Sequence, residues 1–129
     1  MEKKLKQLVF EAIEAEKEKL PKGTTLEEAK KQAESLPIDE LQKSVRSIVK
    51  KQCKAIANDD DLNGFYVDSE VLANAIVCTV IANTICKLGQ AVLKKSIRQI
   101  LVCNGFDIEE KDDDPFLISI LKVVDSIIK

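Results

Sequence analysis

The sequence VLANAIVCTVIANTIC, residues 71–86, contains no charged side chain, although 33% of the residues in the chain are charged. Its polar residues are scattered around a helix instead of forming one polar stripe, a pattern typical of a helix buried on all sides. The run is shorter than the roughly 20 apolar residues that a membrane-spanning helix requires. We therefore predict a buried central helix over about residues 69–86, capped by Asp68 or Ser69, and no membrane span.

The composition of the whole chain is that of a small helical protein. It has 129 residues, of which 45% are hydrophobic, and it contains four glycines and three prolines. Scarce glycine and proline favour long helices over a sheet with many turns. We predict a single domain over residues 1–129 with an all-α fold, a bundle of five or six helices packed around the central one.

Apolar periodicity places most of the other helices. Apolar residues recur at three- and four-residue spacing over residues 2–19, 38–57 and 91–102, and each of these segments is predicted to be a helix. The sequence Leu-Pro-Lys-Gly at residues 20–23 ends the first. The sequence Lys-Leu-Gly at residues 87–89 either ends the central helix or lets it continue through a kink.

Capping signals locate the remaining helix ends. Thr25 and Glu28 form a capping box, which predicts a short surface helix that ends near residue 35. The sequence Asn-Gly-Phe at residues 104–106 predicts a left-handed helix terminator followed by an apolar residue that packs back. Asp114 followed by Pro115 is a strong start signal for the last helix.

The last predicted helix, residues 116–128, is apolar over more than half of its circumference. Its few polar neighbours share one side: Ser119, Lys122, Asp125, Ser126 and Lys129. So wide an apolar face exceeds what one side of a monomeric bundle can cover, and it predicts a homo-oligomer or an obligate protein partner. Phe10 lies off the apolar stripe of the first helix, so it is either an exposed aromatic residue or a contact to a partner.

Two amides interrupt the central apolar run, Asn74 and Asn83. Buried amides can fix the register of neighbouring helices. The alternative is that both are partly exposed and bonded to backbone or water.

An acidic segment, DDDLNGFYVDSE at residues 59–70, lies between two predicted helices. Oxygen-bearing side chains at its first, third, fifth and twelfth positions, with glycine at the sixth, resemble the EF-hand calcium loop. The resemblance implies a calcium site whose ligands are the side chains of Asp59, Asp61, Asn63 and Glu70 and the carbonyl of Phe65. The alternative is a solvated acidic linker that ends in a helix cap.

Basic residues form two rows along predicted helices. The first row is Lys43, Arg46, Lys50 and Lys54, and the second is Lys87, Lys94, Lys95 and Arg98. If the two helices lay side by side, the rows would form one patch suited to nucleic acid, another phosphate-rich ligand or an acidic protein. The alternative is an ordinary solvated surface, since the net charge of the chain is −2.

The sequence contains few of the residue patterns that catalysis usually requires. Histidine is absent, so acid–base chemistry would depend on carboxylates or lysines, and none of the carboxylates lies within an apolar run. Four cysteines lie in apolar helical patterns without CxxC spacing: Cys53, Cys78, Cys86 and Cys103. We predict that they are reduced, buried thiols that behave as small hydrophobic residues, that no cofactor is bound, and that the protein is not an enzyme.

The functional expectation follows by elimination. The N-terminus lacks the apolar region of a signal peptide, so we expect a cytoplasmic protein. We expect it to act by binding a macromolecular partner, as inhibitors, adaptors and immunity factors do, including phage or mobile-element inhibitors of host defence enzymes. Binding of nucleic acid through the lysine-rich helices is the first alternative, and calcium binding at residues 59–70 is the second.

Overall fold

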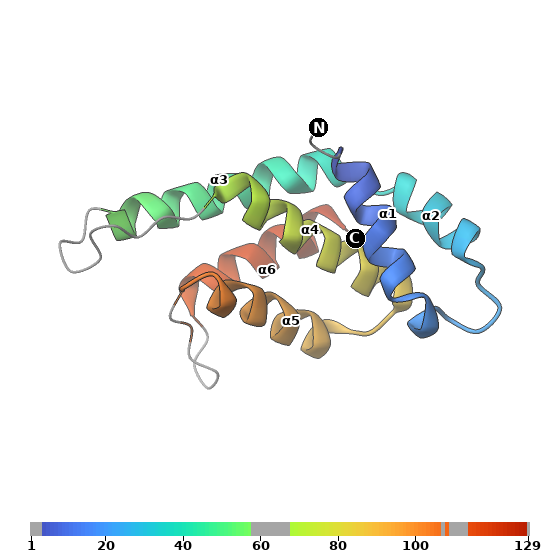
Figure 1. Ribbon diagram of the computed structural model, residues 1–129. Helices are drawn as coiled ribbons and strands as arrows, with labels where there is room; N and C mark the ends of the chain where they lie inside the picture. The colour runs from blue at the N-terminus through green and yellow to red at the C-terminus, as the bar shows by residue number, and fades with distance from the viewer. Residues whose placement is uncertain (1–3, 58–67, 107, 109–113, 129) are drawn as a thin grey trace.

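A computed structural model describes residues 4–57, 68–106, 108 and 114–128, and these residues form helices and no strand (Figure 1). The helices are α1 (Leu5–Ala15), α2 (Leu26–Glu34), α3 (Ile38–Ala57), α4 (Ser69–Cys86), α5 (Gln90–Cys103) and α6 (Pro115–Ile127), with a short 3₁₀ turn, η1 (Lys17–Lys19), after α1. The predicted all-α class is confirmed, with six α-helices in the described part of the chain.

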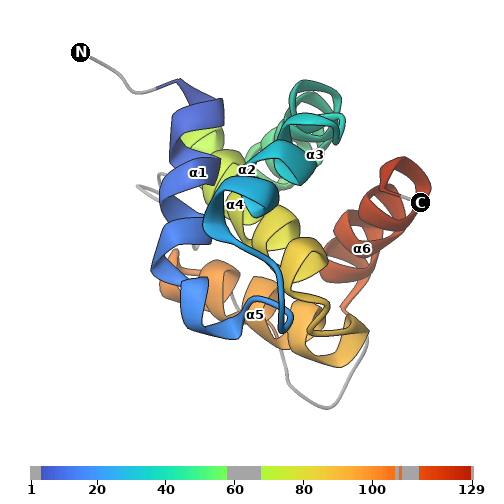
Figure 2. The same cartoon turned by 90° about the vertical axis from the view of Figure 1, so that its right-hand side faces the viewer.

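Helix α4 packs against α1, α2, α3 and α5, while α6 packs against α3 and α5. Viewed along the bundle, α1, α3 and α5 lie around α4, and α6 stands on the far side of α3 and α5 from α1 (Figure 2). Ten residues of α4 are buried, and the side chains of Ile76 and Ile81 are completely enclosed. Because α4 is apolar on nearly all sides, it can supply contacts to several helices at once.

Helix α1 is shorter than the predicted segment of residues 2–19. It ends at Ala15, and the chain tightens into η1, where the Lys19 N–H donates to the Glu16 carbonyl at 2.8 Å. This tighter turn supplies hydrogen bonds to carbonyl groups at the end of the helix. The helix could not continue regularly through Pro21, which has no N–H to donate.

Helix α2 begins at the predicted capping box, because the Thr25 side chain accepts a hydrogen bond from the Glu28 N–H at 3.1 Å. The expectation of a purely surface helix is wrong for one side of it: Ala29 and Ala33 are fully buried. Their small side chains let α2 lie close to α1, its main neighbour.

The junction between α4 and α5 is a true break. The Leu88 N–H donates to the Asn83 carbonyl at 3.2 Å and the Lys87 N–H to the Thr84 carbonyl at 3.3 Å, the two bonds of a Schellman motif. Lys87 itself holds the left-handed position, with φ of 55°. Of the two sequence alternatives, termination is therefore the observed one.

The ends of α5 and α6 follow their predicted signals. Gly105 takes a φ of 94°, and the Phe106 N–H donates to the Leu101 carbonyl at 3.1 Å, so Phe106 is buried against Phe116 with ring centroids 5.0 Å apart. Asp114 caps α6 by accepting from the Phe116 N–H at 2.8 Å. The predicted terminator and start signal are both confirmed.

The wide apolar face of α6 is largely covered within one chain. Phe116, Leu117, Ile120 and Val124 are buried, and the remaining large apolar residues of the helix are at least half-buried. The large hydrophobic side chains that are exposed in the described residues lie elsewhere: Val71, Val92 and Val102. Helix α6 therefore does not itself require a second subunit.

Helix α4 is also the one described helix with the length and composition to cross a membrane. In this fold 56% of the segment is buried among the other helices. The core helix of a soluble protein meets the same criterion, so length and composition alone do not separate the two cases.

Candidate functional site

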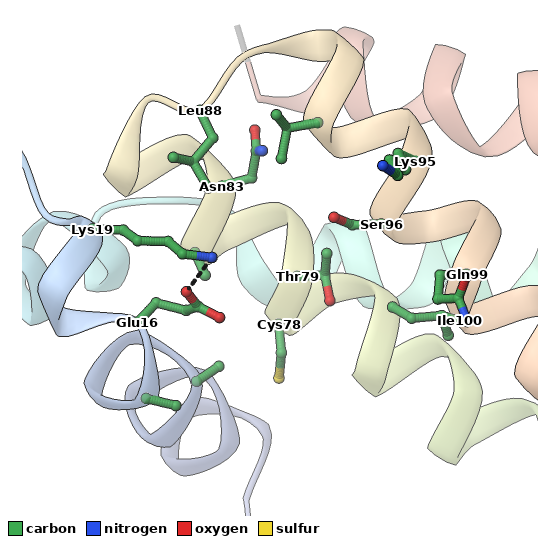
Figure 3. Close-up of a pocket in the computed structure, with 14 residues that line it drawn as sticks. Glu16, Lys19, Cys78, Thr79, Asn83, Leu88, Lys95, Ser96, Gln99 and Ile100 are labelled. Carbon is green, nitrogen blue, oxygen red and sulfur yellow. Dashed lines mark ion pairs between the residues drawn. The ribbon is translucent and has the colours of Figure 1, made fainter.

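A groove of about 550 Å³ lies between α1 and α5 and is floored by α4 (Figure 3). Both walls pack on α4, and the part of α4 between them forms the floor, where Cys78 and Thr79 are half-buried and Ala82 and Asn83 are buried. Its lining is mostly apolar: Ala12, Ala15, Glu16, Lys19, Cys78, Thr79, Ala82, Asn83, Leu88, Val92, Lys95, Ser96, Gln99 and Ile100. We call it the α1–α5 groove.

Small side chains create the floor of this groove. Cys78, Thr79 and Ala82 lie on one side of α4, while bulkier Ile76 and Ile81 point into the core. Spacings of three and four residues keep the small residues on one helical face. Asn83 closes the end of the floor and donates to the Gly89 carbonyl at 3.4 Å, which joins α4 to the start of α5.

The two walls differ in character. On the α1 side, the groove is lined by Ala12 and Ala15 and, after the end of α1, by Glu16 and Lys19. The charged atoms of Glu16 and Lys19 form an ion pair 3.0 Å apart. On the α5 side, Lys95, Ser96, Gln99 and Ile100 line the opposite wall (Figure 3). The groove is therefore an apolar trough with polar and charged groups along its rims.

The thiol on the floor is not activated. Burial raises the pKa of Cys78 from 9.0 to about 11, and the nearby negative charge of Glu11 acts in the same direction. A thiolate is the nucleophilic form of cysteine, so a thiol with this pKa is almost entirely protonated and inert at neutral pH. The groove offers a neutral apolar surface at this point, which suits recognition better than covalent chemistry.

The cysteines are less uniformly buried than predicted. All four are free, but only Cys86 is buried; Cys53 and Cys78 are half-buried and Cys103 is exposed. Cys103 lies in the last turn of α5, where its sulfur accepts from the Gln99 side chain at 3.4 Å. The expectation that it behaves as a core hydrophobe is therefore wrong.

Helix α5 carries an exposed strip that we call the α5 ridge: Val92, Lys95 and Gln99, which line the groove, and Val102, which lies beyond its lining. Val92 is 43% exposed and Val102 is 38% exposed. The spacing of three, four and three residues places the four side chains on one face of the helix. Exposed valines at both ends of one strip mark an apolar surface without a partner inside the chain.

The two predicted basic rows do not merge into one patch. Helix α3 carries exposed Lys43, Lys50 and Lys54 and half-buried Arg46, whereas α4 and α6 lie between α3 and α5 (Figure 2). The condition for a joined patch, that the two helices lie side by side, is not met, because α3 and α5 each pack mainly against α4 and α6.

The members of the second basic row also have separate environments. Lys95 lines the α1–α5 groove, and Lys87 occupies the turn before α5. Lys94 and Arg98 are half-buried, and the Arg98 Nε is enclosed without a hydrogen-bond partner. Only Lys87 and Lys95 of the second row are exposed, and they do not form a continuous exposed row like the one on α3.

Phe10 packs within the chain. It is half-buried against the core, and the ammonium groups of Lys6 and Lys30 lie 5.7 Å and 5.8 Å from the centre of its ring. Cation–π contacts of this kind link α1 to α2. The side chain lies away from the α1–α5 groove, and whether a partner contacts it stays a prediction.

Most of the proposed calcium ligands lie outside the described residues: Asp59, Asp61, Asn63 and Phe65. Glu70 is described and is exposed in the first turn of α4, where its N–H donates to the capping Asp68 at 3.0 Å. Within the described residues no group of three or more metal-binding side chains comes together. The calcium site stays a prediction, which calorimetry with calcium would test.

The two amide side chains of α4 make different hydrogen bonds. The Asn74 side chain accepts from the Gln42 side chain at 3.2 Å, a polar link between α3 and α4 at the edge of the core. Asn83 is buried and holds the turn into α5. Both make specific intramolecular bonds, and Asn74 joins two helices, as a register-fixing amide does.

Sequence analysis did not identify most of the groove. Ala12, Ala82, Val92 and Gln99 carry no motif, and only their position on three packed helices gives them a shared role. The one available signal was the cluster of small residues on a single face of the otherwise bulky α4.

Comparison of this chain with protein-family models, with curated proteins and with solved structures finds no match. The function therefore has to be argued from the groove, the ridge and the charged surfaces themselves.

Proposed function

We propose that this protein acts without catalysis, by binding a protein partner in the α1–α5 groove. The observation that carries the proposal is the largely apolar groove between α1 and α5, with small α4 residues along its floor. Grooves of this kind accept an amphipathic helix, whose apolar side chains fill the trough while its polar face stays in water.

The chemistry of the lining supports binding over reaction. Cys78 is protonated, Glu16 is paired with Lys19, and alanines supply much of the α1 wall. Small side chains along a floor allow close approach of a partner backbone, while Ser96 and Gln99 provide hydrogen-bonding groups on the rim. In the cytoplasm such a protein would serve as an inhibitor, an adaptor or an immunity factor.

Ala15→Arg tests the proposal directly. Ala15 is exposed and lines the groove, so an arginine there obstructs the trough without disturbing the core. Gln7→Arg is the matched control, because Gln7 is an exposed residue of α1 outside the groove and the charge change is the same.

The measurement is a nuclease-treated pull-down from the source lysate with the wild type and both variants. We expect one stoichiometric protein to be retained by the wild type and by Gln7→Arg and to be lost with Ala15→Arg. Equal retention by all three would rule out the groove as the binding surface.

The exposed basic row on α3 supports a second candidate function, binding of nucleic acid. Lys43, Lys50 and Lys54 are exposed along one helix, and such binding would weaken steeply with salt. Charge reversal of Lys50 and Lys54 together should abolish recovery of nucleic acid, and unchanged recovery would exclude this row. Loss of all binding after nuclease treatment would favour this function over the groove.

A further inference from the structure

We infer that the segment bound in the α1–α5 groove is a short amphipathic helix of a partner protein, with an acidic residue on the flank that faces Lys95. The inference rests on the proposed function and names the conformation, the length and the charge of the bound segment. Three features of the groove carry it: its helical sides, its small apolar lining and its distribution of charge.

The sides of the groove favour a helix over an extended peptide. Helices α1 and α5 form the two walls and α4 the floor, so a further helix in the groove would complete a four-helix arrangement. An extended segment would find no strand edge among the described residues, and the backbone groups of the three helices are already paired within them. A helix brings its own backbone hydrogen bonds and needs only side-chain contacts.

The length of the groove limits the length of the bound helix. The lining on the α5 side runs from Val92 to Ile100, which spans about 12 Å of helix at about 1.5 Å per residue. A helix that follows α5 over this distance makes about two turns inside the groove. The bound segment is therefore short, and the rest of the partner lies outside the groove.

The lining leaves room for large apolar side chains from the partner. Cys78 and Ala82 on the floor and Ala12 and Ala15 on the α1 side are small, while Val92 on the α5 side is 43% exposed. Leucine or phenylalanine side chains of the bound helix would fill this space and cover Val92. Two turns place such side chains at positions i, i+3 or i+4, and i+7.

The charge of the groove is positive on its α5 side alone. Its charged lining residues are Glu16, Lys19 and Lys95. Glu16 and Lys19 neutralise each other at 3.0 Å, whereas Lys95 is exposed and forms no ion pair with the described residues. Because the whole chain carries a net charge of −2, this positive flank is a local feature. A carboxylate on the α5-facing flank of the bound helix would pair with Lys95, while the neutral α1 side sets no charge preference.

The test is a selection of random displayed peptides, each longer than about two helical turns, on the full chain. Groove-dependent peptides are those that bind the wild type and Gln7→Arg but not Ala15→Arg. We expect these peptides to share the helical apolar spacing, with aspartate or glutamate on one flank of the apolar stripe. Selection on Lys95→Glu should replace that acid with lysine or arginine. Selection on Lys122→Glu, an exposed lysine of α6 outside the groove, should retain the acid.

The tightest peptide from the wild-type selection gives a quantitative readout by fluorescence anisotropy. Lys95→Glu should weaken its binding at least about fivefold, because an attraction at the rim becomes a repulsion. Replacing the acidic residue of the peptide with lysine should recover part of this loss on the Lys95→Glu variant. Binding to the wild type should also weaken as salt rises. Circular dichroism should show that every variant remains helical and that the peptide gains helicity when it binds.

The outcomes that overturn the inference separate it from the proposed function. Groove-dependent peptides without an acidic preference, or with the same preference on Lys95→Glu, would overturn the inference and leave the proposed function in place. Groove-dependent binding of dodecanoate but of no helical peptide would overturn both, as would a dimer of this chain that Ala15→Arg abolishes while no other protein is captured. Absence of any peptide or captured protein that is lost with Ala15→Arg would also contradict both.

Discussion

Lys87 is the one non-glycine residue of the described chain with a positive φ, at 55°. Its left-handed conformation completes the Schellman motif that separates α4 from α5, and for an L-residue with a side chain it costs about 1 kcal/mol. We therefore expect Lys87→Gly to raise the free energy of unfolding by about 0.5–1 kcal/mol, measured by urea denaturation.

The control for this prediction is the same substitution inside a helix. Lys122 is exposed in α6, and Lys122→Gly should lower the free energy of unfolding by about 1 kcal/mol. If both glycines destabilised the protein equally, the left-handed strain at Lys87 would be absent.

Cys78 predicts a pH dependence of stability. Burial and the charge of Glu11 raise the pKa of its thiol to about 11, so the folded state favours the neutral form. The stability that this preference contributes is complete below the unfolded pKa of 9.0 and is lost as the pH rises toward 11. Wild-type stability relative to Cys78→Ala should therefore fall between pH 9 and 11, as measured by urea denaturation at each pH. A constant difference across this range would contradict the assigned cause.

At the scale of the element, the cap of α6 carries a measurable part of the stability. The Asp114 carboxylate accepts from the N–H groups of Phe116 and Leu117, at 2.8 Å and 3.4 Å. Asp114→Ala should lower the free energy of unfolding by about 1 kcal/mol in chemical denaturation. Asp125→Ala, on the exposed side of the same helix, should change it by less than about 0.5 kcal/mol.

Helix ends such as this one could be predicted from sequence because their causes are local. The cap at Asp114, the capping box at Thr25 and the terminator at Gly105 each depend on residues within one turn, and the structure confirms all three. The end of α1 was placed too late because the residues after Ala15 are charged and form a 3₁₀ turn, a change of helix type that apolar periodicity does not signal.

The adjacency of elements could not be predicted in the same way. The spacing of basic residues shows which of them share a face of one helix, but nothing in it shows that α4 and α6 separate α3 from α5. The same holds for the groove, whose lining comes from α1, α4 and α5 and exists only once these three helices are packed. The sequence showed that α4 is apolar nearly all round, but not which of its faces forms the floor of the groove.

For the whole molecule, the exposed apolar surface lies in a different place from the one that the sequence suggested. The argument for self-association through α6 therefore changes. The width of the apolar face on α6 suggested that a second subunit covers it, but α3 and α5 bury much of it. The exposed valines lie on α5 and at the start of α4 instead. Of these valines, Val92 lines the α1–α5 groove, the surface on which the proposed partner binding depends.

The core of the molecule predicts how it unfolds. Ile76 is fully enclosed in α4, the helix that packs against α1, α2, α3 and α5, so a cavity there weakens several interfaces together. Ile76→Ala should cost about 2–5 kcal/mol, a large share of the roughly 5–15 kcal/mol typical of such domains. Val71→Ala, on the same helix but 63% exposed, should cost far less. Urea denaturation followed by circular dichroism and by exposure of Cys86 should show one coincident transition in all three proteins. If Cys86 became reactive before helicity was lost, α4 would not be the element that couples the others.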